Sequence, residues 1–329
     1  MRCSALICAC KRVLSISLTA LVVSCLLVHI ASAATFSRIT PNQNYVGQIR
    51  VHLTSEGEVF PDIARNENLG FTELMSANRG ADPWLSPAGT PVILSGFHIL
   101  PDAAAEGIVV NLAAQRLFYF HPDSNRVSTF PIGVSREGHT TPLGNTSIVR
   151  KKADPIWYPT KGARAEDPSL GAAVPPGPDN PLGRHALYLD WPLYLIHGTN
   201  RPDGVGRTVS RGCLRLYPED IEKLFELVPV GTKVQIVDQE AAVTWIGNQL
   251  YVQVFPTREQ AEEIGISGKS SNRIQSSELY VRVMEAAERG GGAVDWMAVE
   301  RAGLERTGMP VRVGSAVQLI SIATTSSSD

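Results

Sequence analysis

His197 and Cys213 are the two residues of the chain whose types and spacing suit nucleophilic catalysis. His197 ends an apolar run, while Cys213 follows Gly212 and comes shortly before a predicted helix. An imidazole within hydrogen-bond reach can take the proton of a thiol and stabilise the thiolate, which is the better nucleophile. Backbone N–H groups near Gly212 can bind a developing oxyanion, because a glycine leaves the approach open. The pattern predicts nucleophilic catalysis by Cys213, with His197 as proton donor and acceptor and Gly212 in the oxyanion-hole region.

A structural role and a metal site are the alternatives for these two residues. A lone cysteine is often a small buried hydrophobe, but the glycines and polar residues around both positions favour catalysis. A zinc ion needs three or four protein ligands, and His185 is the one further residue that can be considered as a third. We therefore expect no metal and no other cofactor.

The other cysteines all lie in the first 25 residues, at Cys3, Cys8, Cys10 and Cys25. Residues 1–33 combine three basic residues, an apolar run over Val13–Ile30 and the ending Ala31-Ser32-Ala33, an order typical of a cleaved signal peptide. An uncleaved membrane anchor and lipidation at Cys25 are the alternatives. The small residues at the end of the run favour cleavage, which predicts an exported protein with no membrane span after processing.

Composition limits the kinds of partner. The formal net charge is −2, and it becomes −2 − 3 = −5 when the three basic residues of the leader are removed. Such a balance gives no reason to expect a nucleic-acid partner. A hydrophobic content of 43% argues against disorder, and a length of 329 residues suggests about two domains.

The elements that position His197 and Cys213 belong to a β-rich region, residues 105–238. Strand-like runs are predicted at 108–112, 116–120, 127–134, 146–151, 185–189, 193–197 and 233–237. Pro218 and two acidic residues open a short helix after Cys213. We expect a mixed, mainly β fold with a β-sandwich-like catalytic domain.

A segment rich in proline and glycine interrupts this β region. Residues 154–183 hold seven prolines and four glycines, with Trp157 and Tyr158 near their start. A long structureless stretch inside a compact domain is usually a lid or a linker, and linkers rarely carry adjacent aromatic residues. We therefore expect a lid or cleft wall.

Two further regions flank the β domain. Residues 42–100 show a βααβ order, with Thr72 as a candidate N-cap of the second helix. Residues 239–329 form an α+β tail of unknown role, in which helices are expected after Thr257, Ser277 and Asp295.

The residues around His197 and Cys213 resemble the signature of the L,D-transpeptidase (YkuD-type) catalytic domain. The matching residues are His197-Gly198-Thr199, then Ser210, Gly212, Cys213 and Arg215, with Thr141-Pro142-Leu143-Gly144 and Asn180-Pro181-Leu182-Gly183 earlier in the chain. Arg211 stands where the family has histidine, and because arginine cannot act as a base the base role is left to His197. The region 42–100 resembles a LysM glycan-binding module, although Ser55-Glu56-Gly57-Glu58 replaces the usual Gly-Asp-Thr turn. A small packing domain without a ligand is the alternative for this region.

The resemblance implies a periplasmic enzyme of a Gram-negative bacterium that acts on peptidoglycan. The donor would be a stem tetrapeptide, cut after its third, diamino acid residue through a thioester on Cys213. The acceptor would be another stem's diamino acid or the C-terminal Lys of an outer-membrane lipoprotein. A hydrolase on the same scaffold and a catalytically silent wall-binding protein are the alternatives.

Six residues are predicted to contact the substrate. They are Arg215, Ser210, Arg211, Gly198, Trp157 and Tyr158. A guanidinium binds carboxylates bidentately, so Arg215 suits a carboxylate of the stem peptide, with an internal ion pair to Glu219 or Asp220 as its alternative.

Overall fold

The computed structural model describes residues 34–38, 40–136, 138–270 and 277–316. The predicted signal peptide, Cys25 and the last 13 residues lie outside the described residues. In the described ranges, no helix combines the length and apolar character that a membrane span requires.

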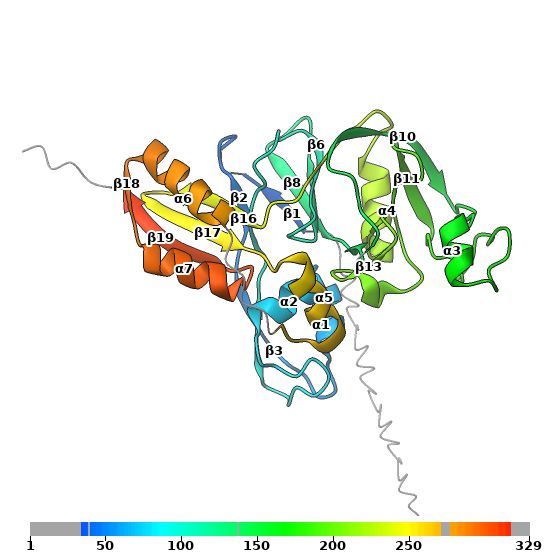
Figure 1. The fold of residues 1–329 in the computed structure, drawn as a ribbon, viewed down its shortest axis with the longest axis horizontal. Helices are drawn as coiled ribbons and strands as arrows, with labels where there is room; N and C mark the ends of the chain where they lie inside the picture. The colour runs from blue at the N-terminus through cyan, green and yellow to red at the C-terminus, as the bar shows by residue number, and fades with distance from the viewer. Residues whose placement is uncertain (1–33, 39, 137, 271–276, 317–329) are drawn as a thin grey trace, which may run out of the picture.

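A curled sheet of nine strands is the largest element, and Figure 1 labels several of its strands. His197 lies in this sheet, and Cys213 directly precedes its edge strand. Its spatial order is β1-β8-β7-β6-β15-β10-β11-β12-β14. The strands are β1 (Ala34–Ser37), β6 (Gly107–Asn111), β7 (Arg116–Phe120), β8 (Arg126–Pro131), β10 (Gly144–Ala153), β11 (His185–Leu189), β12 (Leu195–His197), β14 (Leu214–Arg215) and β15 (Lys233–Val237). A parallel pair, β9 (Val134–Ser135) and β13 (Thr208–Ser210), forms a separate small sheet. The expected mainly β fold is confirmed.

One hydrophobic core joins the two halves of this sheet and the helix α4 (Pro218–Leu227). Its fully buried members include Ile108, Leu117, Phe130, Leu187, Ile196, Leu214, Ile221 and Leu224. Side chains of a strand alternate between its two faces, so the residues between these core members lie on the opposite face of the sheet. The sandwich-like architecture is thus built by one sheet that curls around its own core.

The predicted lid is not structureless. It holds the helix α3 (Lys161–Glu166), which begins after Thr160 because the Thr160 hydroxyl accepts a hydrogen bond from the Ala163 N–H at 3.1 Å. Trp157 and Val174 also pair through their backbones. A second short element, the 3₁₀ helix η1 (Pro202–Gly204), lies between His197 and Cys213.

The N-terminal region has the βααβ order that the sequence indicated. Its elements are β2 (Tyr45–Gly47), β3 (Arg50–Leu53), α1 (Phe60–Asn66), α2 (Phe71–Ala77), β4 (Pro91–Leu94) and β5 (Phe97–Ile99), with β3 paired to β4 and β2 to β5. The prediction that Thr72 is the N-cap of α2 was wrong. Gly70 occupies that position, and its N–H donates to the Glu73 carboxylate at 3.1 Å.

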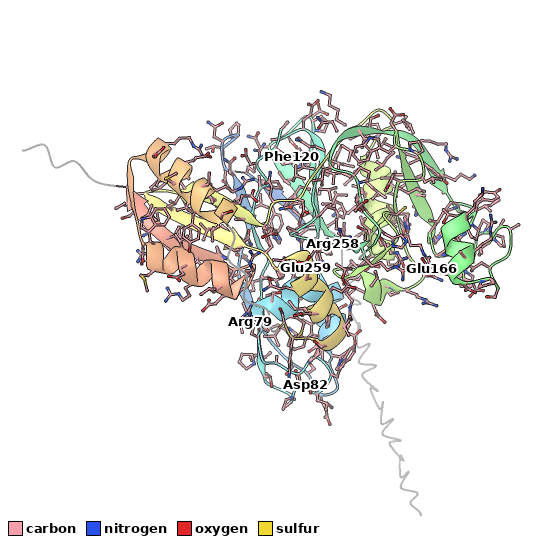
Figure 2. The ribbon with its side chains drawn as sticks, in the orientation of Figure 1. Arg79, Asp82, Phe120, Glu166, Arg258 and Glu259 are labelled. Atoms are coloured by element: carbon pink, nitrogen blue, oxygen red, sulfur yellow. The ribbon has the colours of Figure 1, made fainter. Side chains whose placement is uncertain are left out.

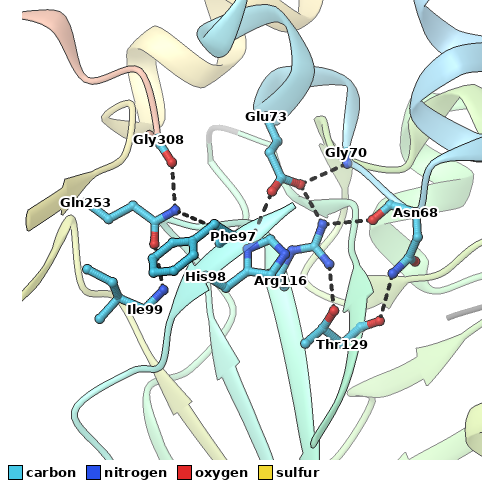
Figure 3. A network of polar contacts seen from close by, with 10 residues as sticks. All are labelled: Asn68, Gly70, Glu73, Phe97, His98, Ile99, Arg116, Thr129, Gln253 and Gly308. Carbon is cyan, nitrogen blue, oxygen red and sulfur yellow. Dashed lines mark hydrogen bonds and ion pairs between the residues drawn. The ribbon is translucent and has the colours of Figure 1, made fainter. Parts of the chain in front are cut away.

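A buried arginine fixes this region to the catalytic sheet (Figure 3). Arg116 of β7 is 1% exposed and donates to the Glu73 carboxylate at 2.6 Å, the Asn68 carbonyl at 3.0 Å and the Thr129 hydroxyl at 3.1 Å. A buried charge is tolerated only when it is paired and hydrogen-bonded. The N-terminal region is therefore a packed part of the fold.

The C-terminal region forms a second, four-stranded sheet in the order β16-β17-β19-β18. Its elements are β16 (Ala241–Ile246), β17 (Gln249–Val254), α5 (Arg258–Ser267), α6 (Ser277–Gly290), β18 (Gly292–Val294), α7 (Trp296–Glu305) and β19 (Pro310–Ala316). Thr257 and Asp295 cap α5 and α7, as predicted, whereas Ser277, expected to precede its helix, is a residue of α6. Gln253 accepts from the Ile99 N–H and donates to the Phe97 carbonyl, both at 2.8 Å, which joins this sheet to β5 (Figure 3).

Candidate active site

The pairing of β12 with β14 brings the two candidate catalytic residues together. The strands run in parallel, with Ile196 opposite Leu214 and His197 opposite Arg215. Ile196 and Leu214 point into the core, so His197 and Arg215 share the opposite face, next to the position that Cys213 occupies just before β14. A sheet register therefore joins residues that lie far apart in the chain.

His197 is oriented by its neighbour's backbone. Its Nδ1 lies 2.6 Å from the Gly198 carbonyl oxygen, and because a carbonyl only accepts, Nδ1 carries the proton and Nε2 is left as the proton acceptor. The side chain is buried, and that burial, with the nearby Arg215 charge, lowers the pKa of His197 to about 3. His197 is consequently a neutral imidazole at ordinary working pH.

Cys213 is a half-buried free thiol. Its Sγ lies 3.5 Å from the carbonyl oxygen of Leu193, a residue held at the left-handed φ of 72°. Burial raises the pKa of the Cys213 thiol, and a backbone hydrogen bond at Leu195 and the Arg215 charge only partly oppose this effect. Both shifts favour the neutral forms of the Cys213 thiol and the His197 imidazole.

The turn before Cys213 is held by hydroxyl groups. Ser210 Oγ donates to the Cys213 carbonyl at 2.6 Å, and Thr141 Oγ1 donates to the Gly212 carbonyl at 2.9 Å. Gly212 has a φ of 108°, and a Cβ atom there would lie 2.9 Å from the Tyr194 ring, so this position requires glycine. The Cys213 N–H has no hydrogen-bond acceptor among the described residues and is available to an oxyanion.

Gly198 is buried and serves packing. A Cβ atom there would lie 2.9 Å from Ile221 of α4 and 3.3 Å from the Leu182 carbonyl, and the Gly198 N–H donates to the His185 carbonyl at 3.1 Å. These contacts fix the end of β12 and hence the His197 ring. The predicted substrate contact at Gly198 stays a prediction.

Arg215 has no carboxylate partner within the described part of the chain. Its alternative partner Glu219 instead binds Arg65 bidentately, with two distances of 2.8 Å. The Arg215 Nε atom is buried without a hydrogen bond, and burial, reinforced by the nearby guanidinium of Arg211, lowers the pKa of Arg215. A cation in this state is suited to an incoming anion.

Arg211 binds the lid. Its Nη2 lies 2.5 Å from Oε2 of Glu166, which Figure 2 labels beside α3, and Arg136 pairs with the same carboxylate. Hydrogen bonds from Arg211 and then Arg136 lower the pKa of Glu166 to about 2. Sequence reasoning missed Glu166, because its partners lie 30 and 45 positions away. Arg211, two positions before Cys213, thus joins the end of α3 to the turn that leads to this cysteine.

The two lid aromatics lie differently. Trp157 is half-buried and pairs with Val174, whereas Tyr158 is 66% exposed. No hydrogen bond or ring contact joins either one to His197 or Cys213 in the ranges that the structure describes.

Other candidate features lie away from this site. Cavities of about 370 and 630 Å³ occur beside α7 and beside β1, and neither is lined by His197 or Cys213. Among the residues placed by the structure, no group of three or more His, Cys, Asp or Glu side chains is arranged to hold a metal ion. The His185 ring packs on Phe225, with ring centroids 4.6 Å apart.

Comparison with known proteins matches the chain to one family. A model of the L,D-transpeptidase catalytic domain, YkuD, matches residues 105–236. The chain is 39% identical over 291 residues to the probable L,D-transpeptidase YbiS of Escherichia coli K12, covering 86% of this chain and 93% of YbiS. The chain belongs to the L,D-transpeptidase family.

This L,D-transpeptidase family chain is also similar to other members of the family. It is 39% identical over 300 residues to the probable L,D-transpeptidase ErfK/SrfK of E. coli K12, covering 87% of this chain and 93% of the relative. Among solved structures, an Enterococcus faecium L,D-transpeptidase mutant matches 45% of this chain and 56% of its own, at 21% identity and a TM-score of 0.33. L,D-transpeptidase 3 of Mycobacterium tuberculosis matches 46% and 70%, at 16% identity and a TM-score of 0.32. The similarity to the two E. coli proteins covers far more of the chain than the catalytic domain alone.

Proposed function

We propose that the chain transfers acyl groups between peptidoglycan stem peptides through a thioester on Cys213. The observation that carries this proposal is the β12–β14 register, which sets His197 and the position of Cys213 on one face beside an unpaired Cys213 N–H. Acyl transfer needs a nucleophile, a base and an oxyanion donor, and this arrangement supports those roles for Cys213, His197 and the Cys213 N–H.

The proposed first half-reaction forms the thioester. The Cys213 proton passes to His197 Nε2 as Sγ bonds to the carbonyl carbon of the third stem residue, and the displaced electron pair becomes an oxyanion at the Cys213 N–H. The C–N bond then breaks, and D-Ala leaves with the proton from His197. An amine acceptor repeats these steps in reverse order and releases Cys213. Because the resting pair is neutral, proton transfer accompanies the attack.

Arg215 is proposed to bind a carboxylate of the stem peptide. It shares the sheet face of His197, is half-buried and lacks an acidic partner among the described residues. Arg211 is proposed to act indirectly, because it already pairs with Glu166 and thereby sets the position of the lid. Substrate contacts of Ser210, Trp157 and Tyr158 remain part of the proposal.

The N-terminal region, residues 42–100, is proposed to bind glycan strands. Large apolar side chains are exposed at the end of β3, with Leu53 at 62%, and in the loop between α2 and β4, with Trp84 at 57% and Leu85 at 78%. Asp82 Oδ1 accepts from the backbone N–H groups of Trp84 and Leu85, which fixes this loop at the far tip of the region (Figure 2). Exposed aromatic surface of this kind marks an interaction site. We place the processed protein in the periplasm, where such strands occur.

Incubation of the purified protein with disaccharide-tetrapeptide, resolved by mass, tests the enzymatic proposal. We expect a crosslinked dimer, and a lipoprotein C-terminal peptide added as a second amine should form a conjugate if it is the acceptor. Tripeptide without dimer would instead assign hydrolysis, and unchanged substrate would refute both activities. Cys213→Ala is the control and should leave the substrate intact.

Binding to insoluble peptidoglycan tests the glycan proposal separately. Trp84→Ala should weaken sedimentation with the polymer and leave turnover of the small tetrapeptide unchanged. Equal sedimentation of the variant and the wild type would contradict the assignment of this loop.

A further inference from the structure

Arg258 stands at an unfavourable place for a basic residue. It is the first residue of α5, where the positive end of the helix dipole disfavours a cation and favours an acid. The capping box of α5, formed by Thr257 and Gln260, stabilises the helix start without it. The position of Arg258 therefore calls for an explanation outside its own helix.

The Arg258 guanidinium reaches into the catalytic domain. Its Nη2 lies 2.8 Å from the Ser135 carbonyl, 3.0 Å from Ser135 Oγ, 3.0 Å from the Arg136 carbonyl and 2.9 Å from the His139 carbonyl. All of these acceptors belong to the segment that runs from Ser135, the last residue of β9, to the start of β10, about 120 positions away in the chain. Figure 2 shows Arg258 at the start of α5, near the centre of the molecule.

That segment also contacts the residues that hold the Gly212–Cys213 turn. Ser135 pairs with Ser210 in the β9–β13 sheet, and the Arg136 N–H donates to the Ser210 carbonyl at 2.9 Å. Ser210 Oγ then binds the Cys213 carbonyl. On the other side, Thr141 lies 3.3 Å from Ser135 Oγ and donates to the Gly212 carbonyl. The carbonyls of the two peptides that flank Cys213, of which the Gly212 carbonyl shares its peptide plane with the Cys213 N–H, are thus held by side chains of Thr141 and Ser210 that contact the segment bound by Arg258.

We propose that Arg258 is a positioning residue for acyl transfer, through which the C-terminal region holds the Gly212–Cys213 turn in register with His197. This inference rests on the proposed function of Cys213. Its premise is that the oxyanion donor must be fixed before the reaction, because a small displacement of a reacting group costs a large factor in rate. The tail of the chain then contributes to catalysis without touching the substrate.

The test compares Arg258→Ala and Arg258→Lys with the wild type in full-length processed protein. Arg289→Ala is the matched control, since Arg289 is a 73% exposed residue of α6 that pairs with Glu285, one helical turn away. The readouts are the rate of carbapenem acylation by intact mass and the kcat and KM for disaccharide-tetrapeptide. We expect Arg258→Ala to lower the acylation rate and kcat about tenfold or more with little change in KM. Arg258→Lys, which keeps the charge but not the planar donor fork, should fall between Arg258→Ala and the wild type.

Several outcomes would overturn the proposal. Wild-type rates in Arg258→Ala would do so, and so would a loss that follows only the unfolded fraction measured by circular dichroism. If Arg258→Ala does not fold, a wild-type rate in folded Arg258→Lys decides against the proposal in the same way. A wild type that takes no carbapenem adduct would overturn the proposed function itself, which is distinguishable from failure at Arg258 alone.

Discussion

Substitution of Gly206 tests whether the N-terminal region packs against the loop between His197 and Cys213. This glycine lies between His197 and Cys213, has a φ of 71°, and accepts a hydrogen bond from the Thr72 N–H at 2.9 Å. A Cβ atom there would lie 2.2 Å from the Gly70 Cα and 2.3 Å from the Phe71 nitrogen, and both of these are backbone atoms that cannot rotate away. Gly206→Ala should therefore separate the start of α2 from the loop.

The size of the effect follows from two contributions. Overpacking a close contact costs about 1–3 kcal/mol, and a left-handed φ costs a residue with a Cβ about 1–2 kcal/mol. We expect Gly206→Ala to lower the free energy of unfolding by about 3 kcal/mol and the thermal midpoint by about 6–12 °C. Gly57→Ala is the matched control, because Gly57 has a φ of 74° and a Cβ added there would meet nothing within 4 Å, so only the backbone contribution of about 1–2 kcal/mol remains.

Urea unfolding of the two variants and the wild type, followed by tryptophan fluorescence and by thermal scanning, measures the difference. Acylation by a carbapenem is followed in parallel, and it should slow in Gly206→Ala but not in Gly57→Ala. Equal destabilisation by the two substitutions would refute the inference that α2 is docked on the catalytic loop.

Burial and charge predict three further effects. The pKa of His197 is lowered to about 3, so protonation removes the base only below about pH 4; the carbapenem acylation rate should be flat from pH 5 to 8, and an acidic limb near pH 6.5 would contradict a neutral imidazole. Glu166→Gln removes the charge that tethers α3, so amide hydrogen exchange in residues 161–166 should become faster at low salt, whereas an unchanged rate would show that the ion pair does not hold the lid. Glu73→Gln leaves the buried Arg116 without a carboxylate and should lower stability by about 3 kcal/mol in denaturant titrations. Glu67→Gln, which removes the partner of a half-exposed arginine, should change stability by less than about 1 kcal/mol, and a similar effect of the two substitutions would contradict the distinction.

Local signals predicted much of the secondary structure. The strands His185–Leu189 and Lys233–Val237 have the predicted bounds, and α4 begins at Pro218 as its proline and acidic first turn indicated. The caps at Thr257 and Asp295 were also identified, because a side chain that caps a helix lies within three residues of its target. The predicted N-cap of α2, Thr72, was wrong. The residue at that position, Gly70, has no side chain that could mark the helix start, so Glu73 is the one residue of the capping box that the sequence shows.

The site was predictable as far as its chemistry depends on residue type. A histidine, a cysteine two residues before an arginine, and a glycine before the cysteine carry that information in the sequence alone. The contacts that support them do not, because Glu166, Arg258 and the Gly70–Gly206 contact join segments that only the folded sheet brings together. A local sequence pattern does not encode contacts between residues so far apart in the chain.

Intact-protein mass with peptide mapping after exposure to a carbapenem shows whether Cys213 is the acylated nucleophile, on which the whole mechanism depends. We predict a single adduct on the peptide that contains Cys213 in the wild type and no adduct in Cys213→Ala. An adduct of the same mass that persists in folded Cys213→Ala, or that maps to another peptide, would contradict the assignment of the nucleophile.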